Sequence, residues 1–224
     1  MHKKKIISFK AFKKTAGLTL SVFFIMSLVF VALEPAITQA VTDSATVTAT
    51  VTAEVTIDSP DDTTFSASIP GVSGNPGAPV TASLTWNVKT NNSTGFNLKL
   101  HASQANALYK DVTYYFRDHT TMPSYGWTAA GAGAASFGFT IAAATAADTV
   151  AAFLDGGVSC GAGGNTGGCW SGFNSTTDID VVNRTTETTA SGEDEVVNFK
   201  AESNAKLLEN GSYVATITAT AAVN

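Results

Sequence analysis

Chemically reactive side chains are scarce in this sequence. Its 224 residues include two cysteines and three histidines, and only 14% are charged. Two thiols with no histidine nearby make a poor zinc site. The segment Gly157–Gly161 matches the hydrolase nucleophile pattern G-x-S-x-G by its letters. That pattern needs a following helix and a later histidine, but a glycine-rich stretch follows and no histidine comes after His119. We therefore predict that the protein is not an enzyme and has no cofactor or metal site.

Acidic residues are absent from the start of the chain, which has the order of regions found in a secretory signal. Residues 1–15 hold six lysines and no acid, and an apolar run follows from Ala16 to Leu33. Pro35 interrupts that run, and small residues at Thr38 and Ala40 suit a signal peptidase. We predict cleavage after Ala40; the alternative is an uncleaved membrane anchor. Residues 41–224 are then expected to form a single secreted domain with no integral membrane span.

Positive charge is low in the expected mature chain. Removing residues 1–40 takes away six of the 13 basic residues and one of the 18 acidic residues, which leaves a net charge of −10. Such a surface repels nucleic acid and anionic lipid. We therefore expect no nucleic-acid partner.

The two cysteines, Cys160 and Cys169, are close in sequence. A pair of cysteines in an exported chain is typical of a disulfide. This one would close a loop that holds five glycines and little apolar material. We predict that the two cysteines are bonded.

The first mature segment, Ala45–Ile57, alternates strictly between apolar residues and threonine or glutamate. This pattern predicts a half-buried strand. At about 3.3 Å per residue it would span about 43 Å, much longer than an ordinary strand. Either the strand bends between two sheets of its own domain, or it adds to the open edge of a neighbouring molecule. The candidate assembly residues are Val47, Val51, Val55 and Ile57.

Further strands follow, separated by turn residues. Residues 80–88 and 96–102 alternate and are joined by Asn91–Gly95, which predicts a hairpin. A helix is expected only around Ala142–Leu154, and the acidic stretch Glu187–Glu195 is expected to be a solvated loop. Many short strands with almost no helix predict an all-β protein with an immunoglobulin-like antiparallel β-sandwich. The other predicted strands are 112–116, 137–141, 197–201 and 213–221.

Three aromatic residues are candidates for a binding surface. Tyr125, Trp127 and Trp170 lie near glycines, in expected loops, where exposed rings could stack on sugar faces. The alternative is packing, with Trp170 covering the disulfide. A platform of three exposed rings would indicate a secreted carbohydrate-binding module.

Two groups of acidic residues offer an alternative to the prediction that the protein has no metal site. Asp58 with Asp61 and Asp62, and Asp178 with Asp180, could supply oxygen ligands to calcium. Neither group has the spacing of a twelve-residue calcium loop. Solvated acids are the favoured interpretation in so acidic a chain.

Two stretches carry a family resemblance. The opening segment Val47–Ile57 and the closing Gly211–Thr220 resemble strands of pilin-like bacterial β-sandwiches such as the spore coat protein U family. Val88–Phe96 resembles a hairpin of Gram-positive and candidate-phyla surface proteins, including WxL-type wall proteins. The chain lacks the cysteine usual in the first strand of the former and the paired Trp-x-Leu motifs of the latter.

The resemblance implies a cell-surface sandwich that assembles by strand exchange, with no catalytic residues. We therefore expect a non-enzymatic structural or adhesive component of the bacterial cell surface or of an extracellular filament. Its partners would be further copies of the chain or cell-wall polysaccharide. The alternative is the carbohydrate-binding module.

Overall fold

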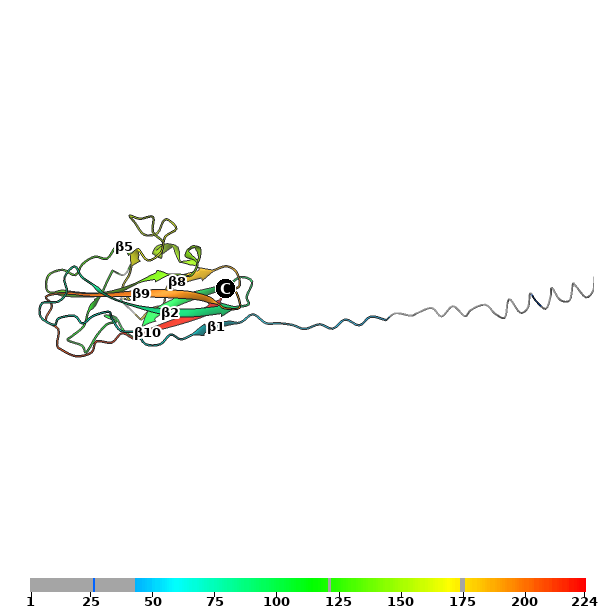
Figure 1. Cartoon of the computed structure of the whole chain (residues 1–224), viewed down its shortest axis with the longest axis horizontal. Coiled ribbons are helices and arrows are strands. Elements are labelled where there is room, and N and C mark those ends of the chain that lie inside the picture. The colour runs from blue at the N-terminus through cyan, green and yellow to red at the C-terminus, as the bar shows by residue number, and fades with distance from the viewer. Residues whose placement is uncertain (1–25, 27–42, 121, 174–175) are drawn as a thin grey trace, which may run out of the picture. The chain divides into compact units, whose positions relative to one another are not determined.

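The computed structural model describes Met26 and residues 43–120, 122–173 and 176–224 (Figure 1). The predicted signal peptide, apart from Met26, and its cleavage site lie outside the described residues. Residues Val51–Asn224 form one compact unit. In the described part of the chain no helix is long and apolar enough to cross a membrane.

The compact unit is mostly β-structure, as predicted. Its strands form a five-stranded sheet in the order β1-β2-β9-β6-β4, a three-stranded sheet β10-β3-β8 and a two-stranded sheet β5-β7. All named strand pairs are antiparallel except β4 with β6. The elements are β1 (Val55–Asp58), β2 (Val80–Thr90), β3 (Phe96–Ala102), β4 (Arg117–Asp118), β5 (Ser124–Tyr125), β6 (Ala134–Ala142), η1 (Ala146–Asp148), η2 (Ala151–Phe153), β7 (Cys169–Trp170), β8 (Ile179–Arg184), β9 (Glu193–Asn204) and β10 (Ile217–Val223).

One hydrophobic core joins residues of the five-stranded and three-stranded sheets. Trp86 of β2 is 5% exposed, and its neighbours Thr85 and Asn87 point to the opposite face because successive side chains of a strand alternate. Phe139 of β6 stacks on Phe173 with ring centroids 4.4 Å apart. The other sheet contributes fully buried core residues at Phe96, Leu98, Leu100, Val181 and Val182.

The predicted hairpin between β2 and β3 is wrong, although the turn between them is present. The N–H of Gly95 donates to the carbonyl of Asn92, at 2.9 Å, and Gly95 has a φ of +80°. The two strands nevertheless lie in different sheets. Both edges of β2 are taken by β1 and β9, and both edges of β3 by β10 and β8. The turn therefore carries the chain from one sheet to the other.

The first strand is shorter than predicted. Only Val55–Asp58 pairs with β2, and residues 43–54 have no strand structure and are exposed. The segment does not bend across to a second sheet within the described residues. An alternating sequence forms a strand only where a neighbouring strand accepts and donates the hydrogen bonds of its backbone N–H and C=O groups. Residues 43–53 pair with no strand in the described part of the chain.

Three further predictions are wrong, each for a local reason. Residues 112–116 form a turn rather than a strand, because Asp111 accepts the N–H groups of Thr113 and Tyr114. Residues 142–154 form two short 3-10 helices rather than one helix, since Val150 donates its N–H to Val181 of β8. The expected acidic loop ends in strand, because Glu193 already belongs to β9.

Candidate functional site

The first candidate is the N-terminal segment, by which we mean residues 43–53. Its valines are almost fully exposed, Val47 at 94% and Val51 at 82%. The other two candidate assembly residues, Val55 and Ile57, lie in β1 and pack against the core. The boundary falls at Glu54, whose N–H donates to the Asn91 side-chain oxygen at 2.7 Å. The structure thus divides the predicted assembly strand into an exposed part and a part built into the five-stranded sheet.

A second feature is a groove of about 610 Å³, called here the end groove, whose lining combines apolar side chains with the polar residues Ser68, Glu209 and Asn210. Leu108, Phe116 and Leu208 form its buried floor, and Phe65 and Tyr213 are partly exposed at its sides. Tyr213 meets Phe116 edge to face, with ring centroids 5.5 Å apart. Single exposed apolar side chains are ordinary on a protein surface, but a hollow with a hydrophobic floor is typical of a binding site.

Glycine is needed where two loops meet beside the end groove. The carbonyl of Gly71 accepts the N–H of Leu208 at 2.8 Å. A Cβ at Gly71 would lie 2.5 Å from the carbonyl oxygen of Leu208, so no larger residue fits without moving the backbone. On the same rim Val72 is 74% exposed. Lys110 and Glu209 form an ion pair of 2.9 Å nearby, and this hydrogen bond raises the pKa of Lys110.

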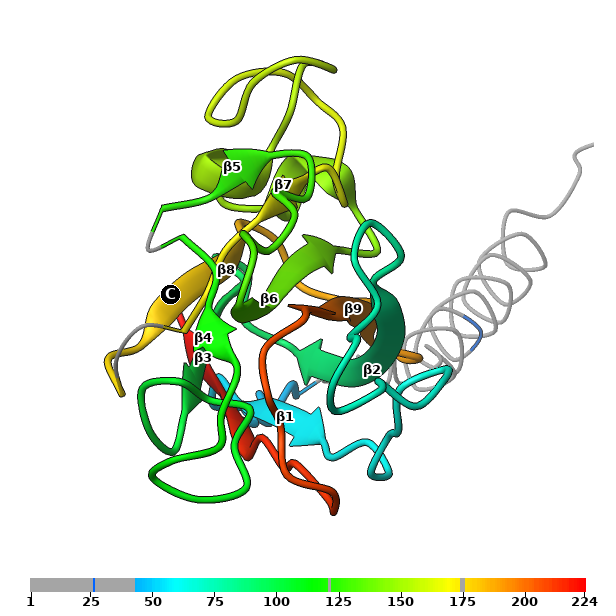
Figure 2. The same cartoon turned by 90° about the vertical axis from the view of Figure 1, so that its left-hand side faces the viewer.

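The predicted sugar-binding residues lie near one another but do not form a flat platform. The rings of Trp127 and Trp170 are 5.5 Å apart and almost perpendicular, at 86°. Trp170 is 6% exposed and carries the ammonium group of Lys200 over its ring, 4.2 Å from the centroid. Only Tyr125 is well exposed, at 44%. Figure 2 shows its strand β5 beside β7, which carries Trp170.

Trp127 has a structural partner that the sequence did not indicate. Its indole N–H donates to a carboxylate oxygen of Glu202 at 2.6 Å, and Glu202 is fully buried. The other oxygen of Glu202 accepts the N–H of Gly77 at 2.7 Å. The opposite side of the indole stacks on His119, with ring centroids 4.6 Å apart. These contacts fix Trp127 in place and cover part of its ring.

The His119 ring itself is 8% exposed, and burial lowers its pKa. Its Nε2 lies 3.4 Å from the hydroxyl of Ser124, at the limit of a hydrogen bond. The carboxylate of Asp118 accepts the N–H groups of Asn106 and Ala107, so it holds a loop in place. This arrangement gives a substrate little access to the serine and the histidine.

Three of the five acids considered as calcium ligands lie beside basic groups, and the other two, Asp61 and Asp62, are exposed. Asp58 pairs with Lys89, Asp180 with Lys99, and Asp178 with His101. Across the described ranges no three histidine, cysteine or carboxylate side chains come together as a metal site.

A buried acidic cluster is the feature that sequence reasoning missed. Arg184 at the end of β8 pairs with Asp148 at 2.8 Å and with Glu193 at 3.4 Å. Glu195 is 2% exposed, and its Oε2 has no hydrogen-bond partner within the described structure. Burial raises the pKa of Glu195 to about 7, and the negative charges of Asp148 and Glu193 act in the same direction. Glu195 shares the inward face of β9 with Val197, and that period-2 relation was the available signal.

The disulfide between Cys160 and Cys169 is confirmed, with the Cα atoms 5.8 Å apart. The glycine-rich loop that it closes is also held at Asp155, whose backbone exchanges hydrogen bonds with Asn165. Gly163 lies so close that a Cβ there would be 2.2 Å from the carbonyl oxygen of Asp155. The loop is thus held by one covalent and one backbone anchor.

Replacing both cysteines with serine should lower the free energy of unfolding by about 2–3 kcal/mol, because the unfolded chain regains the entropy of an open loop. Urea unfolding of the oxidised protein and of the double variant measures this difference. Mass spectrometry under non-reducing conditions checks the bond, and two free thiols in the protein as isolated would contradict it. Val158→Ala is a control beside the same loop, because Val158 is 82% exposed; it should leave stability unchanged.

A scan of protein-family models, a search of curated proteins and a search of solved structures each found no match to this chain.

Proposed function

We propose that this chain is a secreted, non-enzymatic structural component of the bacterial cell surface or of an extracellular filament, built on an immunoglobulin-like β-sandwich. The N-terminal segment is the observation that carries the proposal. Its apolar and polar residues are sorted onto two faces, yet its valines are exposed and it pairs with no strand of the described chain. A sorted segment that has no strand partner in its own chain is suited to pairing with another chain.

The other candidate residues support a structural role. The buried histidine, the ion-paired acids and the covered indole rings all hold segments of the compact unit together. The disulfide holds a loop that is poor in apolar residues, which suits an oxidising location outside the cytoplasm.

Deleting residues 41–49 tests the proposal. A protein comprising residues 41–224 should form filaments or oligomers visible by electron microscopy, and the deletion variant should remain a folded monomer. The stability of the monomer should hardly change, because residues 43–50 are fully exposed and contribute no core contacts. Sedimentation velocity and thermal unfolding measure the two quantities. Full-length assemblies from the deletion variant would overturn this function.

The second candidate, a carbohydrate-binding module, is supported by one observation, the exposure of Tyr125. It is the weaker candidate, because Trp170 is buried and the two indole rings are perpendicular. Flat stacking on a sugar face needs an exposed ring. Retention of the protein on insoluble wall polysaccharide that is lost in Tyr125→Ala would favour this function.

A further inference from the structure

We propose that the end groove is the acceptor site for the N-terminal segment of a second copy of this chain. This inference rests on the proposed function and adds to it the place of contact and the polarity of the assembly. The donor is the N-terminal segment, which joins the compact unit at one end, and the acceptor is the end groove at the other end.

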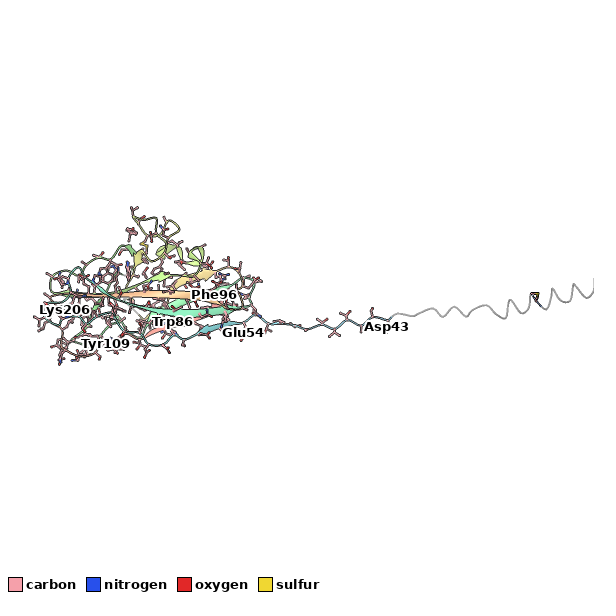
Figure 3. All side chains as sticks on the ribbon, viewed as in Figure 1. Asp43, Glu54, Trp86, Phe96, Tyr109 and Lys206 are labelled. Carbon is pink, nitrogen blue, oxygen red and sulfur yellow. A yellow bond between two sulfur atoms is a disulfide. The ribbon has the colours of Figure 1, made fainter. Side chains whose placement is uncertain are left out.

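The opposite placement of the two features is visible in Figure 3. Glu54, where the chain enters the compact unit, lies at one end, and Tyr109 and Lys206 lie at the other. Tyr109 follows the floor residue Leu108, and Lys206 lies two residues before the floor residue Leu208. A contact between unlike surfaces at opposite ends leaves one free donor and one free acceptor after each addition. Such a head-to-tail interface generates an open filament or a closed ring, according to the rotation between successive copies, rather than a two-fold symmetric dimer.

The chemistry of the groove matches the apolar face of the segment. Buried aromatic and aliphatic side chains form the groove floor, and its rim includes the exposed Val72. The segment presents Val47 and Val51 four residues apart on one face, so both point the same way in an extended chain. Seating these side chains in the groove would remove apolar surface of both partners from water.

Backbone groups beside the groove suit an added strand. Tyr213 lines the groove, and its neighbour Val214 exchanges both backbone hydrogen bonds with Tyr109. In an antiparallel ladder, the backbone groups of the residues on either side of such a pair point to the opposite edge. In the described structure the backbone groups of Tyr213 and Ala215 make no hydrogen bond to another backbone group, and β10, which begins at Ile217, is the edge strand of its sheet. A segment lying in the groove could therefore pair with this stretch.

Charges placed in the groove should weaken assembly without affecting the fold. Val72 and Ser68 both line the groove and are exposed, so Val72→Arg combined with Ser68→Arg should fold normally. We expect the concentration needed for assembly of residues 41–224 to rise roughly tenfold or more. Val158→Arg is the control, because it adds a positive charge at another exposed valine, outside the groove and beside the disulfide loop, and should change nothing.

The donor side has a matched pair of variants as well. Val47→Asp with Val51→Asp should abolish assembly, because both carboxylates would meet the apolar floor of the groove. Thr46→Asp with Thr50→Asp adds the same charge at the same spacing on the other face, so it should assemble nearly as wild type does. Light scattering across a concentration series compares the four variants.

Cross-linking identifies the contact directly. Copies carrying Val51→Cys or Val47→Cys are mixed with copies carrying Val72→Cys under mild oxidation, and mixed dimers are identified by mass. We expect mixed dimers with Val72→Cys and none with Val158→Cys. A single chain carrying both Val51→Cys and Val72→Cys should form no internal bond at high dilution; an internal bond would show that the groove binds the segment of its own chain and would overturn the inference.

The remaining outcomes distinguish a failure of this inference from a failure of the proposed function on which it rests. A wild-type protein that stays monomeric at every concentration overturns both. Assembly that is lost on deleting residues 41–49 but persists in the groove variant, without mixed cross-links, leaves the proposed function standing and overturns the end groove as the acceptor.

Discussion

Replacing Trp86 with alanine is expected to lower the free energy of unfolding by about 3–5 kcal/mol, a large part of the roughly 5–15 kcal/mol that stabilises an ordinary domain. The indole ring is 5% exposed in the core between the two larger sheets. Alanine would remove most of its buried surface and leave a cavity that the flanking strands cannot fill without distortion. Chemical denaturation measured by circular dichroism checks the result.

Two other variants control for the position of Trp86. Trp86→Phe keeps much of the ring volume, so we expect a smaller loss, of about 1–2 kcal/mol. Thr85→Ala lies on the exposed face of the same strand and should cost under about 0.5 kcal/mol. If Trp86→Ala melted near the wild-type temperature, the assignment of this face of β2 to the core would be wrong.

Protein stability should fall by roughly 3 kcal/mol as the pH rises from about 4.5 to about 7, because of Glu195. Burial raises the pKa of this carboxyl from 4.5 to about 7 in the folded protein. Between those pH values the unfolded chain has lost the proton and the folded protein has kept it, so each pH unit costs about 1.4 kcal/mol. Above pH 7 both states are ionised and this contribution stays constant.

Glu195→Gln should remove that slope and be more stable than the wild type at pH 8. The amide is neutral at every pH, and its NH₂ group can donate to the carboxylate of Asp148 or Glu193, whose charges act on Glu195. Urea midpoints at pH 5 and pH 8 for both proteins measure the effect. Because burial lowers the pKa of His119, that residue stabilises the protein as the pH rises through the same range. His119 contributes equally to the wild type and to Glu195→Gln, so its contribution cancels when their stabilities are subtracted. Equal slopes of stability against pH in the two proteins would refute the role of Glu195.

Local sequence pattern determined the inward faces of the longest strands and the covalent bond. Alternation over residues 80–88 and 96–102 put Trp86 and Leu98 on the apolar faces of their strands, and both are buried. Cysteine pairing in an exported chain indicated the disulfide, which the structure contains. Both inferences depend on side-chain chemistry within a few residues, so a single sequence was enough.

Strand partners were decided only by the tertiary structure. The turn at Asn91–Gly95 has hairpin chemistry, yet β2 and β3 separate because other strands occupy all four of their edges. The β8 strand, Ile179–Arg184, escaped prediction altogether, although it lies beside β3 and places Arg184 near the acids of η1 and β9. These contacts join residues far apart in sequence, and no local pattern encodes which edge remains free.

The candidate site shows the same division. Sequence alone selected the alternating segment from Ala45 to Ile57 and the three aromatic residues. Only the tertiary structure decided that Val55 and Ile57 pack against the core while Val47 and Val51 stay exposed, and that Glu202 binds Trp127. The end groove is formed by three segments that are far apart in the sequence, around Phe65, Leu108 and Leu208. Periodicity shows that a residue can be buried, but burial itself requires a partner, and long-range packing determines where partners are available.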